Sequence, residues 1–163
     1  FCVSTCRSNL LKNPRAEDGL QGWEIVKNGG DGWLTENRGH PDDTVTKCFL
    51  TSFRLCLKQQ LIDLKERGYS DAFMDLLQPP IRISDWYSPR YDCGSEYQIC
   101  VELLDQRKNP IRTFQPGRVS FQQWNKEPWC QVSRVTHAVK FFFCSQTYSQ
   151  RVVVPVCVLL YSR

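Results

Sequence analysis

Apolar and polar side chains alternate along Tyr97-Gln98-Ile99-Cys100-Val101-Glu102-Leu103. Successive side chains of a β-strand point to opposite faces of its sheet, so this period of two predicts a strand with one buried and one solvated face. Leu57 and Leu61 alternate in the same way with Lys58 and Gln60. That second alternation predicts another strand, whose leucines face the core.

Turn signals rich in proline and glycine separate further strand candidates. The signals include Asn109-Pro110, Gln115-Pro116-Gly117 and Glu127-Pro128. The additional strands are expected at residues 22–27, 44–52, 81–84, 111–115, 118–123, 129–137, 140–146 and 151–161. Strands of modest length at fairly regular spacing indicate an all-β sandwich or barrel.

One helix interrupts the strands after residue 70. Ser70 is a suitable N-cap, and Asp71 places negative charge in the first turn. The expected apolar face consists of Phe73, Met74, Leu76 and Leu77, and Pro79 and Pro80 end the helix. Because the helix lies between two strand candidates, it is expected to close one end of the sandwich.

Length and composition fit a single globular domain. The chain has 163 residues and a mass of 19.0 kDa, with 41% apolar and 23% charged residues. The net charge is +4, but acidic and basic residues are interspersed, so nucleic acid is not an expected partner. No apolar run approaches the roughly 20 residues that span a bilayer, so membrane insertion is not expected.

The nine cysteines favour a reducing compartment. Their number is odd, they include no Cys-x-x-Cys pair, and the chain carries no Asn-x-Ser/Thr sequon. Reduced thiols fit this pattern better than a disulfide framework does, which indicates cytosolic or nuclear residence, and we expect a cytoplasmic protein.

The glycine-rich segment Asn28-Gly29-Gly30-Asp31-Gly32-Trp33 predicts a sharp turn. Such a turn can set Asp31 and Trp33 side by side at the surface, and a carboxylate beside an aromatic ring suits a sugar. Further rings occur in turn-rich contexts, namely Trp86, Tyr87, Tyr91, Trp124 and Trp129. Each of these rings either stacks on a ligand or closes an end of the core, and Trp23 and Trp86 are expected in the core.

No side-chain pattern points to catalysis. His40 and His137 each stand alone, without the spacing of a metal-ligand set. Aspartates could supply the paired carboxylates of a glycosidase, but the required separation of roughly 5–10 Å depends on the fold. We therefore expect a binding domain with no catalytic residue, no cofactor and no metal.

An ordered series of motifs runs from about residue 9 to residue 137. It comprises Asn9-Leu-Leu-Lys-Asn-Pro14, Gly22-Trp23, Asn28 to Trp33, Thr51-Ser-Phe-Arg-Leu-Cys56, Gln60-Leu-Ile-Asp-Leu64, Gly68-Tyr69, Leu76-Leu77, Gln78-Pro79, Asp85-Trp-Tyr87, Arg90, Asp92-Cys-Gly94, Tyr97 and Gln122-Gln-Trp-Asn125. This series resembles the F-box-associated domain of the sugar-binding F-box proteins, and it keeps the order of that family and nearly its spacing.

The resemblance implies both a fold and a function. The fold would be an antiparallel, jelly-roll-like (galactose-binding-like) β-sandwich with one short helix. The protein would be the substrate-recognition part of a Skp1–cullin–F-box (SCF) ubiquitin ligase. It would bind the chitobiose core of high-mannose N-glycans on misfolded glycoproteins destined for endoplasmic-reticulum-associated degradation. Ubiquitin transfer would belong to partner subunits.

The same resemblance implies two ligand-binding residues and a domain layout. Phe53 would form an apolar wall of the glycan site, and Asp92 would accept hydrogen bonds from sugar hydroxyls. Residues 1–8 would end a linker from an upstream F-box, which would contact Skp1. Residues 9–163 would form the domain, and 138–163 would be a divergent tail.

That tail departs from the family pattern and leaves an alternative open. The family's late aromatic loop, with its Tyr-Trp or Phe-Trp pair, is not recoverable after about residue 137. A protein-interaction domain of the same fold without glycan binding is therefore the second hypothesis. Phe141–Phe143 and Val152–Leu160 either replace the family's late strands or form exposed strand edges.

Overall fold

The computed structural model describes residues 9–105, 107–126, 128–137 and 151–161, of which His137 and residues 151–161 are described by their backbone. Its elements follow one another as β1 (Glu24–Asn28), β2 (Leu34–Asn37), β3 (Lys47–Leu50), β4 (Cys56–Asp63), α1 (Asp71–Leu77), β5 (Pro80–Tyr87), β6 (Gly94–Ile99), β7 (Val101–Leu104), β8 (Pro110–Phe114), β9 (Val119–Phe121), β10 (Cys130–His137) and β11 (Arg151–Tyr161). The strand candidate at 140–146 lies outside the described residues.

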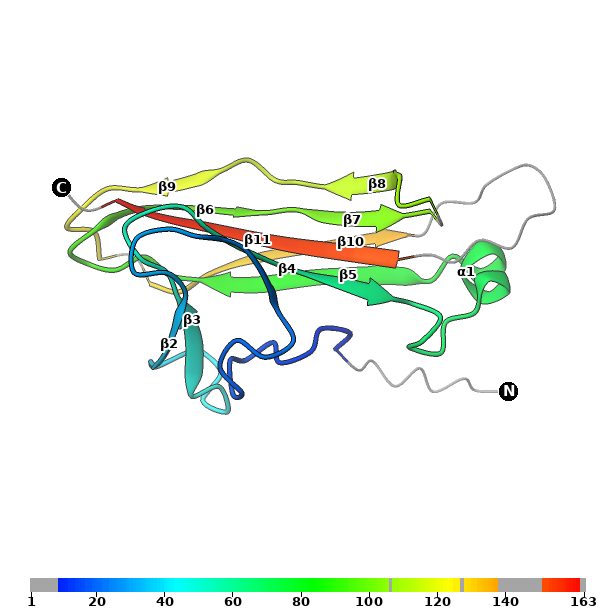
Figure 1. Cartoon of the computed structure of the whole chain (residues 1–163), viewed down its shortest axis with the longest axis horizontal. Helices are drawn as coiled ribbons and strands as arrows, with labels where there is room; N and C mark the ends of the chain where they lie inside the picture. The colour runs from blue at the N-terminus through cyan, green and yellow to red at the C-terminus, as the bar shows by residue number, and fades with distance from the viewer. Residues whose placement is uncertain (1–8, 106, 127, 138–150, 162–163) are drawn as a thin grey trace.

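The strands form an antiparallel sandwich (Figure 1). One layer is a 7-stranded sheet in the order β1-β4-β11-β6-β9, in which β7 also pairs with β11 and β8. The second layer is the pair β10-β5, and β2 and β3 form a separate hairpin. All described strand pairs are antiparallel. The predicted fold class, an antiparallel β-sandwich with one short helix, is confirmed.

The core lies between the two layers. It contains Ile62 of β4, Ile83 of β5, Tyr97 and Ile99 of β6, Val101 and Leu103 of β7, with Leu64 and Met74. The apolar face of the alternation at 97–103 is therefore buried as predicted. Burial of each such side chain stabilises the folded state by about 1.5–3 kcal/mol, so this face contributes strongly to the stability of the sandwich.

Strand β4 has the opposite phase to the one predicted. Lys58 and Gln60 point into the molecule and are 3% and 5% exposed, whereas Leu61 is on the outer face and half exposed. The expectation of a buried leucine face is therefore wrong. Ile62 and Leu64, which share their parity with Lys58, are buried and set the phase.

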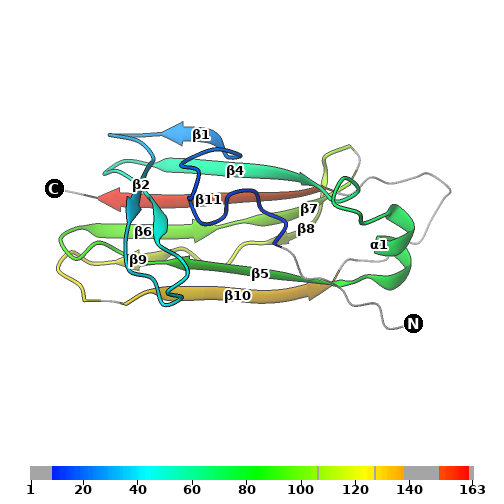
Figure 2. The ribbon, with the colours of Figure 1, turned by 90° about the horizontal axis from the view of Figure 1, so that it is seen from below.

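Helix α1 begins at the predicted cap. The Ser70 Oγ accepts a hydrogen bond from the Phe73 N–H at 3.2 Å. Only part of the expected apolar face is used: Met74 is buried and Phe73 packs against the core, but Leu76 and Leu77 are exposed. The helix lies at one end of the sandwich in both views (Figures 1 and 2). No helix among the described residues has the length and apolarity needed to cross a bilayer.

Strand β11 occupies an interior place in the large sheet. It pairs with β4 along one side and with β6 and β7 along the other (Figure 2). Val152–Leu160 is expected from the sequence either to replace a late strand of the family or to form an exposed strand edge. The structure shows that the segment fills a strand position in the sheet. Phe141–Phe143 lie outside the described residues.

Candidate functional site

Four loops lie at the end of the sandwich opposite α1 (Figure 1). We call them the rim, and define it as the described residues 29–33, 51–55, 88–93, 122–126 and 128–129. The strand register explains why these loops share one end. Asn28 at the end of β1 pairs with Cys56 at the start of β4, which places loops 29–33 and 51–55 together. Ser95 in β6 pairs with Phe121 at the end of β9, and Cys130 at the start of β10 pairs with Tyr87 at the end of β5, which does the same for the other two loops.

Phe53 lies on the part of the rim formed by the glycine-rich turn. The Gly29 N–H donates to the Leu55 carbonyl at 3.1 Å, and the Asp31 N–H donates to the Ser52 Oγ at 2.8 Å. A Cβ on Gly30 would lie 3.2 Å from Cε1 of Phe53, so the Phe53 ring flanks the turn. The Phe53 side chain is 43% exposed and can offer a ring surface to a ligand.

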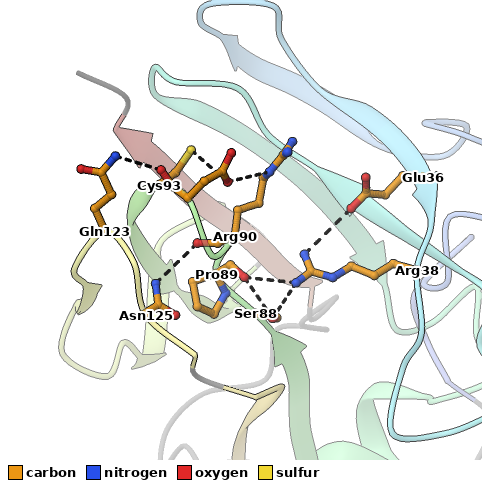
Figure 3. Close-up of polar contacts among 9 residues, drawn as sticks. Glu36, Arg38, Ser88, Pro89, Arg90, Cys93, Gln123 and Asn125 are labelled. Atoms are coloured by element: carbon orange, nitrogen blue, oxygen red, sulfur yellow. Dashed lines mark hydrogen bonds and ion pairs between the residues drawn. The ribbon is translucent and has the colours of Figure 1, made fainter.

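Asp92 lies on the neighbouring part of the rim, in the loop between β5 and β6. Its Oδ1 lies 3.4 Å from Nε of Arg90 and accepts a long hydrogen bond from the Cys93 thiol. Its backbone carbonyl accepts a hydrogen bond from Gln123 Nε2 at 3.0 Å. Figure 3 labels Arg90, Cys93 and Gln123, whose polar contacts in this loop are drawn as dashed lines.

The structure brings Phe53 and Asp92 to the same end of one sheet. The strands that follow their loops, β4 and β6, do not pair with each other. Phe53 precedes β4 and Asp92 precedes β6, and β11 runs between these strands with Val158 opposite both Cys56 and Tyr97. Neighbouring strands lie about 4.8 Å apart, so β4 and β6 are separated by about 10 Å. Phe53 and Asp92 therefore lie in two separate loops at the same end of the sheet.

The expectation that Asp31 and Trp33 lie side by side at the surface is wrong for Trp33. Asp31 is exposed, but the Trp33 side chain is buried. The Asn28 Oδ1 accepts a hydrogen bond from the Trp33 N–H at 2.7 Å and folds the turn inward. The Trp33 ring packs edge-on against Phe49, with ring centroids 6.5 Å apart.

Lys58 sits in a cage of aromatic rings directly below this turn. Its Nζ lies 2.9 Å from the centre of the Phe49 ring, 3.6 Å from Trp23 and 5.3 Å from Trp33. Ring faces attract a cation and partly replace lost hydration. Burial nevertheless lowers the pKa of Lys58 to about 6, against the opposing effect of the Asp85 carboxylate. Sequence reasoning missed this cage; the signal was the parity that Lys58 shares with Ile62.

Asp85 continues this buried polar group toward the core. Its Oδ2 accepts a hydrogen bond from the Tyr97 hydroxyl at 2.7 Å, and its Oδ1 accepts one from the Trp86 N–H at 3.0 Å. Burial raises the pKa of Asp85, which the Tyr97 hydrogen bond and the Lys58 charge oppose. Burial and the nearby Asp85 also raise the pKa of Tyr97. Lys58 and Tyr97 of this group are buried, whereas Asp85 is half-buried.

A second aromatic group ties the β2–β3 connection to the rim. His40 packs edge-on against Trp86 and Trp129, and the Trp129 Nε1 donates to the Gly39 carbonyl at 2.6 Å. Arg38 donates to Ser88 Oγ and to the Pro89 carbonyl (Figure 3). Trp86 is 37% exposed, so its expected place in the core is wrong, whereas Trp23 packs against the core as predicted.

The remaining rim aromatics form one exposed pair. Tyr91 and Trp124 come from different loops, and their ring centroids lie 5.6 Å apart at an interplanar angle of 66°.

The cysteine side chains that the structure describes are free thiols, namely Cys48, Cys56, Cys93, Cys100 and Cys130.

The family model of the F-box associated region matches residues 2–141. The chain belongs to this family. Mouse F-box only protein 44 is 42% identical over 139 residues, which cover 82% of this chain and 54% of that protein. Human F-box only protein 44 is 44% identical over the same shares, and bovine F-box only protein 2 is 39% identical over 74% of this chain and 43% of that protein.

The chain thus spans about half the length of these F-box associated relatives. Among solved structures, the enzymatically active domain of bacteriophage CBA120 tailspike protein 4 matches with a TM-score of 0.55 and 13% identity. That match covers 93% of this chain and 19% of the other. At this identity the likeness is one of fold alone.

Proposed function

We propose that this F-box associated region is the substrate-recognition domain of an SCF-type ubiquitin ligase and binds the chitobiose core of high-mannose N-glycans on misfolded glycoproteins. Its role would be non-enzymatic. The glycoprotein would be held for ubiquitination and endoplasmic-reticulum-associated degradation, and ubiquitin transfer would belong to Skp1–cullin partners engaged through an F-box of the full-length protein.

Membership of the family carries this proposal, because the matched relatives are named as F-box proteins. The rim is the place where a glycan would bind. The half-exposed Phe53 offers an apolar surface for the C–H face of a sugar ring, and the exposed Asp92 offers a carboxylate for its hydroxyls. Small-ligand sites typically combine ring surfaces with a few polar groups in this way.

Cytoplasmic residence is part of the proposal. Misfolded glycoproteins retro-translocated from the endoplasmic reticulum would be ubiquitinated in the cytoplasm. The described free thiols, including the buried Cys56, fit a reducing compartment.

The test is a glycan array probed with the chain and with two variants. Signal on chitobiose-containing oligomannose, lost in Phe53→Ala and retained in Leu76→Ala, is the expected result. Leu76 is an exposed apolar residue on α1 at the opposite end of the molecule, so it controls for general loss of apolar surface. Absence of signal from the unmodified chain would refute glycan recognition.

A second candidate function is protein recognition by the same fold without a glycan site. The observation that favours it is the end of the family match at residue 141, which leaves β11 outside the matched region. Capture of an unglycosylated misfolded protein, together with a silent glycan array, would select this candidate. Removal of N-glycans from the captured substrates distinguishes the two functions directly.

A further inference from the structure

Tyr91 and Trp124 are large aromatic residues that are exposed to solvent. Their side chains are 55% and 62% exposed. They meet edge to face at 66°, so that together they make a corner with one ring as its floor and the other as its wall. Large rings are usually mostly buried, and this exposed pair is therefore a feature of the surface and not of the core.

The two loops that carry the rings are held together by groups other than the rings. Gln123 Nε2 donates to the Asp92 carbonyl at 3.0 Å. Asn125 Nδ2 donates to the Gln122 carbonyl at 2.7 Å and lies 3.5 Å from the Arg90 carbonyl oxygen (Figure 3). The ring pair is consequently in place before any ligand arrives, which reduces the ordering that binding must supply.

The backbone conformation at Trp124 is a second observation that points to a ligand-binding role for this residue. Trp124 has φ +63°, in the left-handed region that bulky residues rarely adopt. Strain of this kind is concentrated at ligand-binding and active sites, where the surrounding structure holds it in place. Here the flanking Gln123 and Asn125 hydrogen bonds hold it.

Charged groups next to the rings decide which ligand fits. The Asp92 carboxylate and the Arg90 guanidinium form an ion pair at 3.4 Å, and both are about half exposed. The described contacts of the Asp92 carboxylate use its Oδ1 atom. Its second oxygen, Oδ2, can accept a hydrogen bond from a ligand hydroxyl. A ligand at this corner therefore meets ring faces and a hydrogen-bonding edge together.

An N-acetylhexosamine matches this combination. One face of its pyranose ring is made of C–H groups, its hydroxyls lie around the edge, and its acetamido group carries a methyl. A polypeptide fits less well, because aromatic hot spots of protein interfaces lie in wide, desolvated apolar surroundings. The neighbours of this pair are charged or amide side chains, namely Arg90, Asp92, Gln123 and Asn125.

We propose that Tyr91 and Trp124 form the stacking platform for an N-acetylhexosamine ring, with Asp92 as the acceptor for its hydroxyls. This inference rests on the proposed function, since it takes a glycan as the ligand. It adds a second set of contacts at the rim, supplied by the loops before β6 and before β10. These contacts act in addition to Phe53 and define the sugar type that the rim selects.

The test is a titration of the chain with N,N′-diacetylchitobiose, followed by NMR at the indole N–H of Trp124 and by calorimetry. Trp124→Gly removes the ring and tolerates the left-handed φ, so the loop can keep its shape. Tyr91→Ala removes the partner ring at a position of ordinary φ, and serves if the first variant does not fold. Tyr91→Phe keeps the ring, and Leu76→Ala is the control at the far end.

The expected result is a shifted Trp124 resonance and an affinity at least about tenfold weaker in Trp124→Gly and Tyr91→Ala, with little change in Tyr91→Phe and Leu76→Ala. Unchanged sugar affinity in both ring-removing variants, with affinity lost in Phe53→Ala, overturns the platform and leaves the proposed function intact. No sugar binding by the unmodified chain overturns both. Loss of binding to an unglycosylated polypeptide alone in the ring variants also overturns the platform.

Discussion

The Nζ atom of Lys58 lies 2.9 Å from the centre of the Phe49 ring, inside a cage completed by Trp23 and Trp33. Strand β4 places the lysine there, and the rings come from three other segments of the chain. The cage lies under the turn 29–33 and so connects the rim to the interior. Its chemistry, and that of the residues around it, leads to four predictions.

Lys58→Met should abolish a pH dependence of stability. An unfolded lysine keeps its proton up to about pH 10.5, whereas burial lowers the pKa of folded Lys58 to about 6. Between these values the unfolded state binds more protons, so stability rises with pH by up to about 1.4 kcal/mol per unit. Urea denaturation at pH 6.5 and 8.5 measures this slope, and Lys65→Met, at an exposed position, should preserve it. An unchanged slope in Lys58→Met would contradict the prediction.

Tyr97→Phe should destabilise the domain by about 1–3 kcal/mol, because it leaves the Asp85 Oδ2 without the 2.7 Å hydrogen bond from the hydroxyl. The variant keeps the ring that stacks on Tyr87 at 3.8 Å. Tyr87→Phe is the matched control, since it keeps both the stack and the Asp85 bond. Equal midpoints of urea denaturation for the two variants would show that the Asp85 contact contributes nothing.

Gln60→Ala should release the segment that precedes β1. The buried Gln60 amide donates to the Lys12 carbonyl at 2.6 Å and accepts from the Lys12 N–H at 2.9 Å. Loss of both bonds should cost about 2 kcal/mol and should speed hydrogen exchange at the Lys12 amide. Gln59→Ala, next to it on the outer face, breaks one exposed contact with Glu24 and should cost less than about 0.5 kcal/mol. Slow exchange at Lys12 in Gln60→Ala would disprove this anchoring.

Gly30→Ala should distort the turn beside Phe53. Gly30 has φ +63°, and a Cβ there would lie 2.5 Å from the Ser52 Oγ. The strain should lower stability by about 1–3 kcal/mol and weaken glycan binding. Gly39→Ala is the control, because a Cβ at Gly39 meets nothing within 4 Å. Thermal melts and glycan titrations of both variants check the effect, and equal behaviour of the two would rule out a tight Gly30 turn.

Phe53 and Asp92 illustrate how far the family resemblance reaches. It selected two residues whose loops the sheet register then places at one end of the molecule. It did not select Tyr91 and Trp124 as ligand-binding residues, because their loops are distant in sequence and come together only in the fold, through the ring contact and the Gln123 and Asn125 hydrogen bonds. Their side-chain exposure, on which a ligand role depends, is a property of the assembled rim.

Strand β11 shows a similar division. Its apolar composition predicts a strand, yet its interior position depends on its neighbours. Pro155 pairs with Gln59 of β4, and the register places Cys100 across from it on the other side, at the one residue between β6 and β7. A proline nitrogen carries no hydrogen for the ladder, and the break between β6 and β7 accommodates it there.

Local patterns by themselves determined the strand-rich class, the capped helix and the buried face of residues 97–103, because alternation and capping act between near neighbours in the chain. Tertiary packing alone decided that Lys58 points inward, that Trp33 is buried and that β11 is an interior strand. Each of these outcomes depends on rings or strand edges contributed by distant segments, and the free energy of a buried side chain is set by what surrounds it in space.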